Sequence, residues 1–213
     1  MDESSIREIT SERTLLSQPD GSSNYSQGDS TVMVGIYGPA DIKQSKEQMD
    51  RATVEVIFKP KIGLAGVREK AMETMISNTC QAIVITTMHP RSSITIVVQV
   101  IQDAGSLLSC CINAVCMALM DAGISMKCLV AAVSCAITDE GAVIVDPTLK
   151  VTEDASAVLH FAFDSTEKHL VLSSTHGSCT TDQYMSCLKS CQDACDKLFE
   201  FYRTSAERRF SKT

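Results

Sequence analysis

The segment Leu107–Met120 restricts the fold of this chain more than any other feature of the sequence. Its residues are apolar on almost every side of a helix, and only Ser109 and Asn113 interrupt them. A helix that is hydrophobic all round has no face for water, so it is buried between other elements. The chain has 213 residues, enough to supply covering layers. No apolar run reaches the roughly 18 residues of a membrane-spanning helix. We therefore predict a layered fold with this helix at its centre.

The rest of the chain alternates between strand and helix patterns. Runs of β-branched and apolar residues bounded by turn residues predict strands at Val32–Tyr37, Thr53–Phe58, Ser93–Ile101, Cys128–Ile137, Ala142–Val145, Ala157–Phe163 and His169–Ser174. Apolar residues three and four positions apart predict a helix over Val67–Ile85. A last helix of about 25 residues starts at a capping box formed by Thr180 and Gln183. Strand hairpins that are followed by helices along the chain predict an α+β fold in which sheets pack against helices.

The domain organisation follows from the absence of a linker. The polar start of the chain predicts a flexible N-terminal segment, residues 1–12, and the remainder, residues 13–213, is expected to form a single domain. Within it, Pro19–Ser23 is a turn cluster. Gly38-Pro39 is expected to end the strand that precedes it.

The charge balance argues against a protein that binds nucleic acid on its own. The formal net charge is -7 and the sequence pI is about 5.1, whereas neutralisation of phosphates by basic side chains supplies most of the affinity of such proteins. Residues 43–70 depart from this balance, with seven basic and four acidic side chains. The candidates there for contact with phosphates are Lys59, Lys61, Arg68 and Lys70. The alternative is that Arg68 and Lys70 belong to a solvated helix start.

The ten cysteines are an unusual number for a chain of this length. They lack the paired spacing of zinc ligands, and Cys187, Cys191 and Cys195 coincide with the apolar stripe of the last helix. A catalytic cysteine needs a histidine partner, and the four histidines offer no recognisable pairing. We therefore predict reduced core thiols, with no metal site and no cofactor.

The loop Asp103–Ser106 is the most informative short segment. A glycine and a small hydroxyl residue between a strand and a helix N-terminus predict an anion site, because free N–H groups point outward there. The same residues also make an ordinary helix cap, in which Asp103 or Ser106 accepts a hydrogen bond from the first turn. The chemistry of the residues favours the cap, since Leu107 and Leu108 follow where a basic residue would help to bind an anion.

Several motifs, taken in order, resemble the RNase PH family. The resemblance covers nearly the whole chain from about Arg13. Each motif is weak alone, but the ordered set is specific to the family. The motifs are Asp20-Gly21-Ser22, Gln27-Gly28-Asp29-Ser30-Thr31-Val32, Tyr37-Gly38-Pro39, Lys61-Ile62-Gly63, Asn78-Thr79-Cys80, Asp103-Ala104-Gly105-Ser106-Leu107-Leu108, Asn113-Ala114, Ala118-Leu119 and Phe201-Tyr202-Arg203.

This resemblance implies an RNase PH-like fold, also described as ribosomal protein S5 domain 2-like. It further implies assembly into heterodimers and a hexameric ring, the core of the RNA exosome, with cap subunits and a channel for single-stranded RNA. Active members of the family are phosphate-dependent 3′-to-5′ exoribonucleases. They use an arginine directly after the Gly-Ser/Thr of a phosphate loop and an aspartate as general acid.

The chain departs from the active pattern at two positions. Gly105 and Ser106 match the phosphate loop, but Leu107 stands at the arginine position. Glu153-Asp154 resembles the acidic pair of the family, and counting on from it places the general acid near His160. A leucine cannot form the bidentate contact that holds phosphate. The resemblance thus implies a degenerate phosphate loop and no catalytic residues.

The expected function is therefore that of a non-catalytic exosome ring subunit. Such a subunit holds its neighbours, lines the RNA channel, and supports 3′-to-5′ RNA degradation and rRNA processing in the nucleus, nucleolus and cytoplasm, with no membrane partner. One alternative is an active phosphate-dependent 3′-to-5′ exoribonuclease that acts as a homodimer. A weaker one is a nucleic-acid-binding module acting alone.

Overall fold

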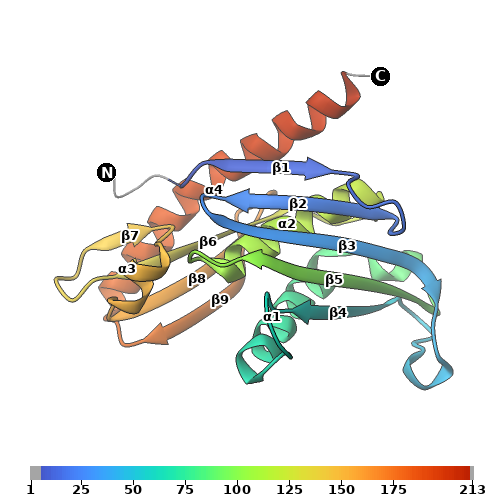
Figure 1. Ribbon diagram of the computed structural model, residues 1–213, viewed down its shortest axis with the longest axis horizontal. Helices are drawn as coiled ribbons and strands as arrows, with labels where there is room; N and C mark the ends of the chain where they lie inside the picture. The colour runs from blue at the N-terminus through green and yellow to red at the C-terminus, as the bar shows by residue number, and fades with distance from the viewer. Residues whose placement is uncertain (1–5, 212–213) are drawn as a thin grey trace.

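Two β-sheets enclose one central helix, as Figure 1 shows. The computed structural model describes residues 6–211, without the side chains of residues 209 and 210. Helix α2 (Leu107–Ala122) contacts β2 and β3 of the first sheet and β6 and β8 of the second. One continuous hydrophobic core includes residues of both sheets. The α+β fold class predicted from the sequence is confirmed.

The first sheet has five strands in the order β1-β2-β3-β5-β4. Neighbouring strands are antiparallel except β4 and β5, which are parallel because helix α1 connects them. The strands are β1 (Ile9–Arg13), β2 (Gly21–Gln27), β3 (Ser30–Asp41), β4 (Thr53–Lys59) and β5 (Ser92–Gln102).

The second sheet has four antiparallel strands in the order β7-β6-β8-β9. Helix α4 packs against β6, β7 and β8, while α1 packs against β4 and contacts β9. The strands are β6 (Val130–Ile137), β7 (Val143–Val145), β8 (Ala157–Asp164) and β9 (Leu170–Gly177). The other helices are α1 (Val67–Ile83), α3 (Leu149–Glu153) and α4 (Thr181–Phe210), with short 3₁₀ turns at Gln44–Lys46 and Thr86–Met88.

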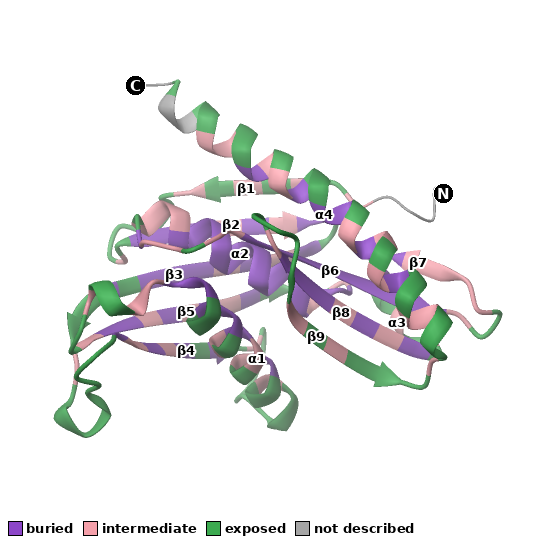
Figure 2. Ribbon diagram, turned by 180° about the vertical axis from the view of Figure 1, so that it is seen from behind, coloured by how far each residue is buried: buried purple, intermediate pink, exposed green. Residues whose placement is uncertain are grey.

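The central helix is buried as its sequence predicts. All its residues from Leu108 to Leu119 are buried, and Figure 2 shows α2 in the colour of buried residues between the sheets. Its polar residues have partners. The Asn113 side chain accepts a hydrogen bond from Ala132 N at 2.8 Å and donates one to Ala132 O at 3.0 Å. The hydroxyl of Tyr202 donates to Asn113 Oδ1 at 3.0 Å. Asn113 thereby joins α2 to β6 and α4.

The start of the fold differs from the sequence prediction. Strand β1 begins at Ile9, inside the segment expected to be flexible, and residues 1–5 of that segment lie outside the described residues. Strand β2 covers part of the predicted turn cluster. Its residues Ser22 and Ser23 are 1% and 0% exposed. A serine-rich run has no hydrophobic alternation, so only the ladders to β1 and β3 make it a strand.

The predicted stop at Gly38-Pro39 is also wrong. Strand β3 continues to Asp41, with a cis peptide bond between Gly38 and Pro39 and a register shift between Tyr37 and Ala40. A proline is accommodated there because the irregularity removes the need for its missing N–H.

The long C-terminal helix begins where its sequence predicts. Gln183 N donates to Thr180 Oγ1, and Thr180 N donates to Gln183 Oε1, which completes the capping box. The helix is 30 residues long, longer than expected. In the described part of the chain, no helix combines the length and apolar character needed to cross a membrane.

The ten cysteines are free thiols, and eight of them are buried. Burial raises the pKa of several of these thiols, those of Cys80 and Cys116 to about 12. They pack as small apolar side chains, in agreement with the core role predicted for them.

Candidate functional site

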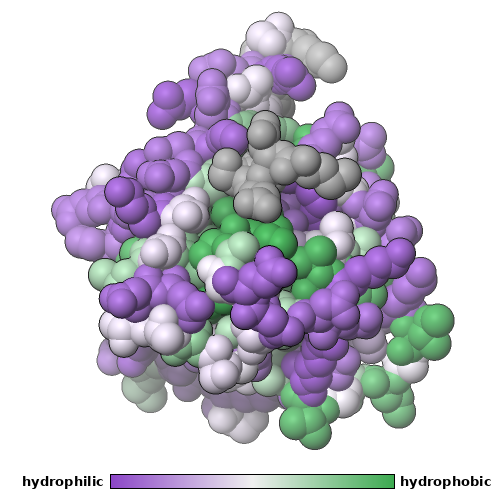
Figure 3. Space-filling model, turned by 90° about the vertical axis from the view of Figure 1, so that its left-hand side faces the viewer, coloured by the Kyte–Doolittle hydropathy of each residue, from purple (hydrophilic) through white to green (hydrophobic). Residues whose placement is uncertain are grey.

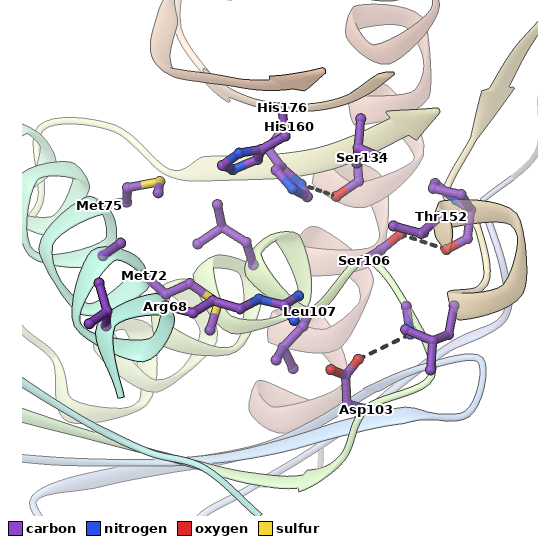
Figure 4. Close-up of a pocket in the computed structure, with 17 residues that line it drawn as sticks. Arg68, Met72, Met75, Asp103, Ser106, Leu107, Ser134, Thr152, His160 and His176 are labelled. Carbon is purple, nitrogen blue, oxygen red and sulfur yellow. Dashed lines mark hydrogen bonds between the residues drawn. The ribbon is translucent and has the colours of Figure 1, made fainter. Parts of the chain in front are cut away.

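A cavity of about 640 Å³ opens at the N-terminal end of α2. The start of α1, the loop before α3, and strands β6, β8 and β9 complete its walls (Figure 4). Its lining is mixed: one side is apolar and the other carries hydroxyl and imidazole groups. The residues labelled in Figure 4 are Arg68, Met72, Met75, Asp103, Ser106, Leu107, Ser134, Thr152, His160 and His176.

The loop before α2 does not form the side-chain cap favoured by its sequence. Ser106 occupies the N-cap position with a left-handed backbone, φ 55°, and makes no capping hydrogen bond. Its hydroxyl donates to Pro147 O at 3.0 Å instead. Asp103 Oδ1 accepts from Gly105 N at 3.1 Å and does not reach the first turn. The helix N-terminus is therefore left without a side-chain cap beside the cavity, as in an anion site.

Gly105 is required by the path of the backbone at this point. Its φ is +109°, and a Cβ atom added there would lie 2.5 Å from Leu149 N and 2.6 Å from Pro147 O. Its carbonyl accepts a hydrogen bond from Ser30 Oγ at 2.7 Å. The loop is thus pressed against the segment that leads into α3, and a side chain at this position does not fit.

A buried ion pair that the sequence did not reveal supports the loop before α2. Arg7 Nε and Nη2 donate to the two oxygens of Asp146 at 2.9 and 2.8 Å, and Arg7 Nη2 also donates to Gly105 O at 3.3 Å. Burial alone would raise the pKa of Asp146, but the hydrogen bonds and charge of Arg7 outweigh it and hold that pKa below its usual range. Asp146 is therefore a structural carboxylate.

A chain of hydrogen bonds enters the cavity from α2. Ser109 Oγ and Ser134 Oγ are 2.5 Å apart, and Ser134 Oγ is 2.7 Å from His160 Nδ1. The His176 ring lies edge-on to His160, with ring centroids 6.2 Å apart. Burial, together with the nearby charges of His176 and Arg68, lowers the pKa of His160 to about 4. His160 is therefore a neutral imidazole at pH 7, able to exchange hydrogen bonds but without a charge.

The residues matched to the family site by sequence are partly brought together. Leu107 and His160 both line the cavity, together with Gly105 and Ser106. Glu153 and Asp154 are exposed and do not line it. Leu107, which the sequence motif matches to the arginine position, is therefore an apolar side chain in the cavity, and His160, near which the general acid is expected, is a neutral imidazole.

The four basic candidates for RNA contact are only partly gathered. Arg68 lines the main cavity and, with Lys61, a smaller neighbouring cavity of about 210 Å³. Lys70 Nζ instead pairs with Glu73 Oε1 at 2.7 Å on its own helix. Lys59 ends β4 and is exposed. Arg68 and Lys61 thus line one cavity, while the charge of Lys70 is already paired.

Apolar side chains are exposed next to these cations. Ile62, Leu64 and Val67 are 84%, 98% and 89% exposed. Figure 3 shows hydrophobic side chains at the centre and along the lower margin of one face that is otherwise largely hydrophilic.

Among the described residues, no group of three or more His, Cys, Asp or Glu side chains is placed to hold a metal ion.

Comparisons with known proteins agree with this geometry. The family described as 3′ exoribonuclease family (RNase PH) matches residues 5–125 with its domain 1 and residues 128–193 with its domain 2. The Arabidopsis thaliana protein named Exosome complex exonuclease RRP46 homolog is 33% identical over 97% of this chain and 94% of its own length. Exosome complex component RRP46 of Saccharomyces cerevisiae is 30% identical over 89% of this chain and 91% of its own length.

A solved structure extends the similarity to three dimensions. The crystal structure of rice (Oryza sativa) Rrp46 matches with a TM-score of 0.93 and 33% identity, covering 97% of this chain and 98% of that chain. The family resemblance read from the sequence motifs is thereby confirmed. The organisation into a single domain stays a prediction, since the family is described in two parts that meet near residue 126. The chain belongs to the 3′ exoribonuclease family, the RNase PH family, and RRP46 proteins are among its homologues.

Proposed function

We propose that this chain is a non-catalytic subunit of the RNA exosome core ring and supports 3′-to-5′ RNA degradation and rRNA processing. Its homologues in Arabidopsis and yeast carry the exosome complex in their names. Similarity over nearly the full length supports the transfer of that role. The finer assignment, to the subunit called exosome component five, is part of the same proposal.

The observation that carries the proposal is the chemistry at two positions of the cavity. Leu107 follows the Gly105-Ser106 loop and presents an apolar side chain where phosphate would bind. His160 is neutral at pH 7, because its pKa is about 4. A neutral imidazole cannot act as the general acid in the way that a carboxylic acid does, and a leucine side chain cannot bind and orient an attacking phosphate. At these two positions the cavity therefore lacks both a phosphate-binding arginine and a general acid, the two groups that active family members use.

The proposed partners are other RNase PH-like subunits, joined in heterodimers within a hexameric ring, together with cap subunits and single-stranded RNA. The exposed apolar side chains of Ile62, Leu64 and Val67 support contact with protein neighbours, because isolated chains seldom expose such groups together. Arg68 and Lys61 are the side chains proposed to meet RNA. The proposed location is the nucleus, nucleolus and cytoplasm.

The experiment that tests the proposal measures phosphorolysis directly. The purified chain is incubated with single-stranded RNA and inorganic phosphate, and nucleoside diphosphates are quantified. We expect no release above that of a Ser106→Tyr variant, whose side chain would fill the loop side of the cavity. An active RNase PH enzyme assayed in parallel shows that the RNA is a usable substrate.

The competing function, an active homodimeric exoribonuclease, predicts the opposite. The Arabidopsis relative has the word exonuclease in its name, which favours this alternative, and the same assay tests it. Phosphate-dependent release that disappears in the Ser106→Tyr variant would establish it. Native mass measurement of the chain, alone and with candidate ring subunits, tests the assembly half of the proposal independently of catalysis.

A further inference from the structure

A second groove of about 690 Å³ lies between strand β1 and helix α4, separate from the cavity at α2. One wall is β1 and the turn after it; the other is a stripe of α4 residues spaced three and four apart. The α4 stripe consists of Lys197, Glu200, Phe201, Thr204, Ser205 and Arg208.

Strand β1 has one unpaired edge, and that edge borders this groove. It is the first strand of its sheet and, among the described strands, pairs only with β2. Glu8 O accepts from Gly28 N, and Thr14 N donates to Ser22 O, so even-numbered residues direct their backbone groups toward β2. The backbone groups of Ile9 and Ser11 therefore point outward. They are a template for one more strand.

Helix α4 lies beside the outer edge of β1, where an added strand would pack against it. In Figures 1 and 2, α4 crosses the sheet and runs on past β1, so that its C-terminal turns extend beyond the sheet edge. Phe201 packs edge-on to Tyr25 of β2, with ring centroids 6.4 Å apart, and fixes the helix at this edge. Arg13 Nη2 donates to the backbone oxygen and the hydroxyl of Ser205.

The two walls have matching lengths. A five-residue strand such as β1 spans about 17 Å at roughly 3.4 Å per residue. The α4 stripe from Lys197 to Arg208 also spans about 17 Å at roughly 1.5 Å per residue. The two walls are thus each long enough to contact a short extended segment of about five residues.

The charges of the groove favour an acidic segment. Lys197 and Arg208 line it together with Glu200, the one acid among its described lining residues, in a chain whose net charge is -7. The Oγ of Ser11 is buried and has no hydrogen-bond partner among the described residues. A nucleic acid would meet the cations, but its sugar-phosphate backbone has no N–H groups to pair with the strand edge, whereas a peptide satisfies both.

We propose that the groove between β1 and α4 binds an extended acidic peptide segment of a partner protein, which adds a strand to β1 and places its acidic side chains over α4. This surface is independent of whether the cavity at α2 is catalytic. The binding mode is strand addition, in which main-chain hydrogen bonds supply affinity and alternate side chains supply specificity.

Nuclear magnetic resonance titration of the full chain tests the proposal. The probe is a synthetic peptide of about seven residues, long enough to pair with all of β1, which alternates aspartate with valine or threonine. We expect the amide signals of Ile9 and Ser11 to shift and to exchange with solvent more slowly. The same peptide N-methylated at alternate amides, or with lysine in place of aspartate, is expected to bind at least about tenfold more weakly.

Two matched variants locate the site. Ser11→Pro removes an outward N–H that β2 does not use, and is expected to weaken peptide binding about tenfold. Ser11→Ala retains that N–H and is expected to bind within about twofold of the unchanged chain. The double variant Lys197→Glu/Arg208→Glu is expected to lose about tenfold. Lys189→Glu, on α4 but outside the groove, is expected to have no effect.

Four results would overturn the proposal. The first is an absence of amide shifts in β1 with the acidic peptide. The second is equal binding of the N-methylated peptide. The third is a shift of the same amides by a single-stranded oligouridylate but not by the peptide, which would assign the groove to nucleic acid. The fourth is a shift of the β1 amide signals that depends on protein concentration without added peptide, which would assign the edge to a second copy of the chain.

Discussion

The guanidinium of Arg7 and the carboxylate of Asp146 form a buried ion pair across 139 positions of sequence, and Asp146 is 4% exposed. The pair ties the segment before β1 to the loop after β7. Arg7 also reaches Gly105 O, so it fixes the loop that precedes α2. The N-terminal segment is therefore part of the support of the cavity.

Replacing Arg7 by alanine is expected to lower the free energy of unfolding by about 3–5 kcal/mol, because it leaves the buried charge of Asp146 without its partner. Chemical denaturation at pH 7 measures the loss. The double variant Arg7→Ala/Asp146→Asn removes both charges and is expected to recover part of it. Asparagine also tolerates the positive φ of 54° at that position. A double variant no more stable than Arg7→Ala would mean that the ion pair is not the source of the loss.

Replacing Gly105 by alanine is expected to cost at least about 2 kcal/mol of stability, because the new Cβ would collide with the backbone before α3. Gly63→Ala is the matched control. Gly63 also has a positive φ, +86°, but nothing lies within 4 Å of its Cβ position, so only the cost of about 1 kcal/mol for the backbone conformation applies. Thermal and urea unfolding compare the two, and equal losses would contradict the close approach at Gly105.

The burial of His160 predicts a pH dependence of stability. Its pKa is about 4 in the folded chain, against an ordinary value of 6.5. Between these values the unfolded chain binds a proton that the folded chain does not. Stability is therefore expected to fall as the pH falls from 6.5 through about 4, by about 3 kcal/mol from this residue.

Urea unfolding at several pH values measures this effect as the difference between the unchanged chain and His160→Gln. The variant lacks the titrating group, so its stability is expected to change less with pH across this window. His89→Gln, which is remote from the cavity, should leave the pH dependence as it is. Parallel curves for the unchanged chain and His160→Gln would show that burial of His160 does not resist protonation.

Introducing an arginine at position 107 is expected to strengthen anion binding. In Leu107→Arg, the guanidinium would join the uncapped N-terminus of α2, and inorganic phosphate is expected to bind at least about tenfold more tightly. Isothermal titration with phosphate measures the change, with Leu107→Met as a control that adds no charge. If the two variants bind phosphate equally, position 107 does not face the anion.

Local patterns predicted the elements whose residues carry their own signal. The all-apolar run of α2 required burial on every side, and the capping box at Thr180 and Gln183 marked the start of α4 within the sequence itself. The motif around Gly105 also pointed to the loop that borders the cavity, and the positive φ of Gly105, +109°, is a local reason for a glycine there.

Other features depend on partners that are distant in sequence. Ser22 and Ser23 give no strand pattern, and their strand exists because β1 and β3 flank it. Asp103 and Ser106 have the chemistry of helix caps, but tertiary contacts draw the Ser106 hydroxyl to Pro147.

The sequence by itself determined the α+β class and the central helix, since each rests on patterns among neighbouring residues. The match of Leu107 to an arginine position of the family stays a prediction from a motif. The tertiary structure alone decided that Arg7 pairs with Asp146, that Ser109, Ser134 and His160 form one chain of hydrogen bonds, and that β1, beside α4, pairs only with β2 among the described strands. Hydrogen bonds and ion pairs act over a few ångströms, so they depend on which distant segments the fold brings together. The order of residues along the chain does not record that proximity.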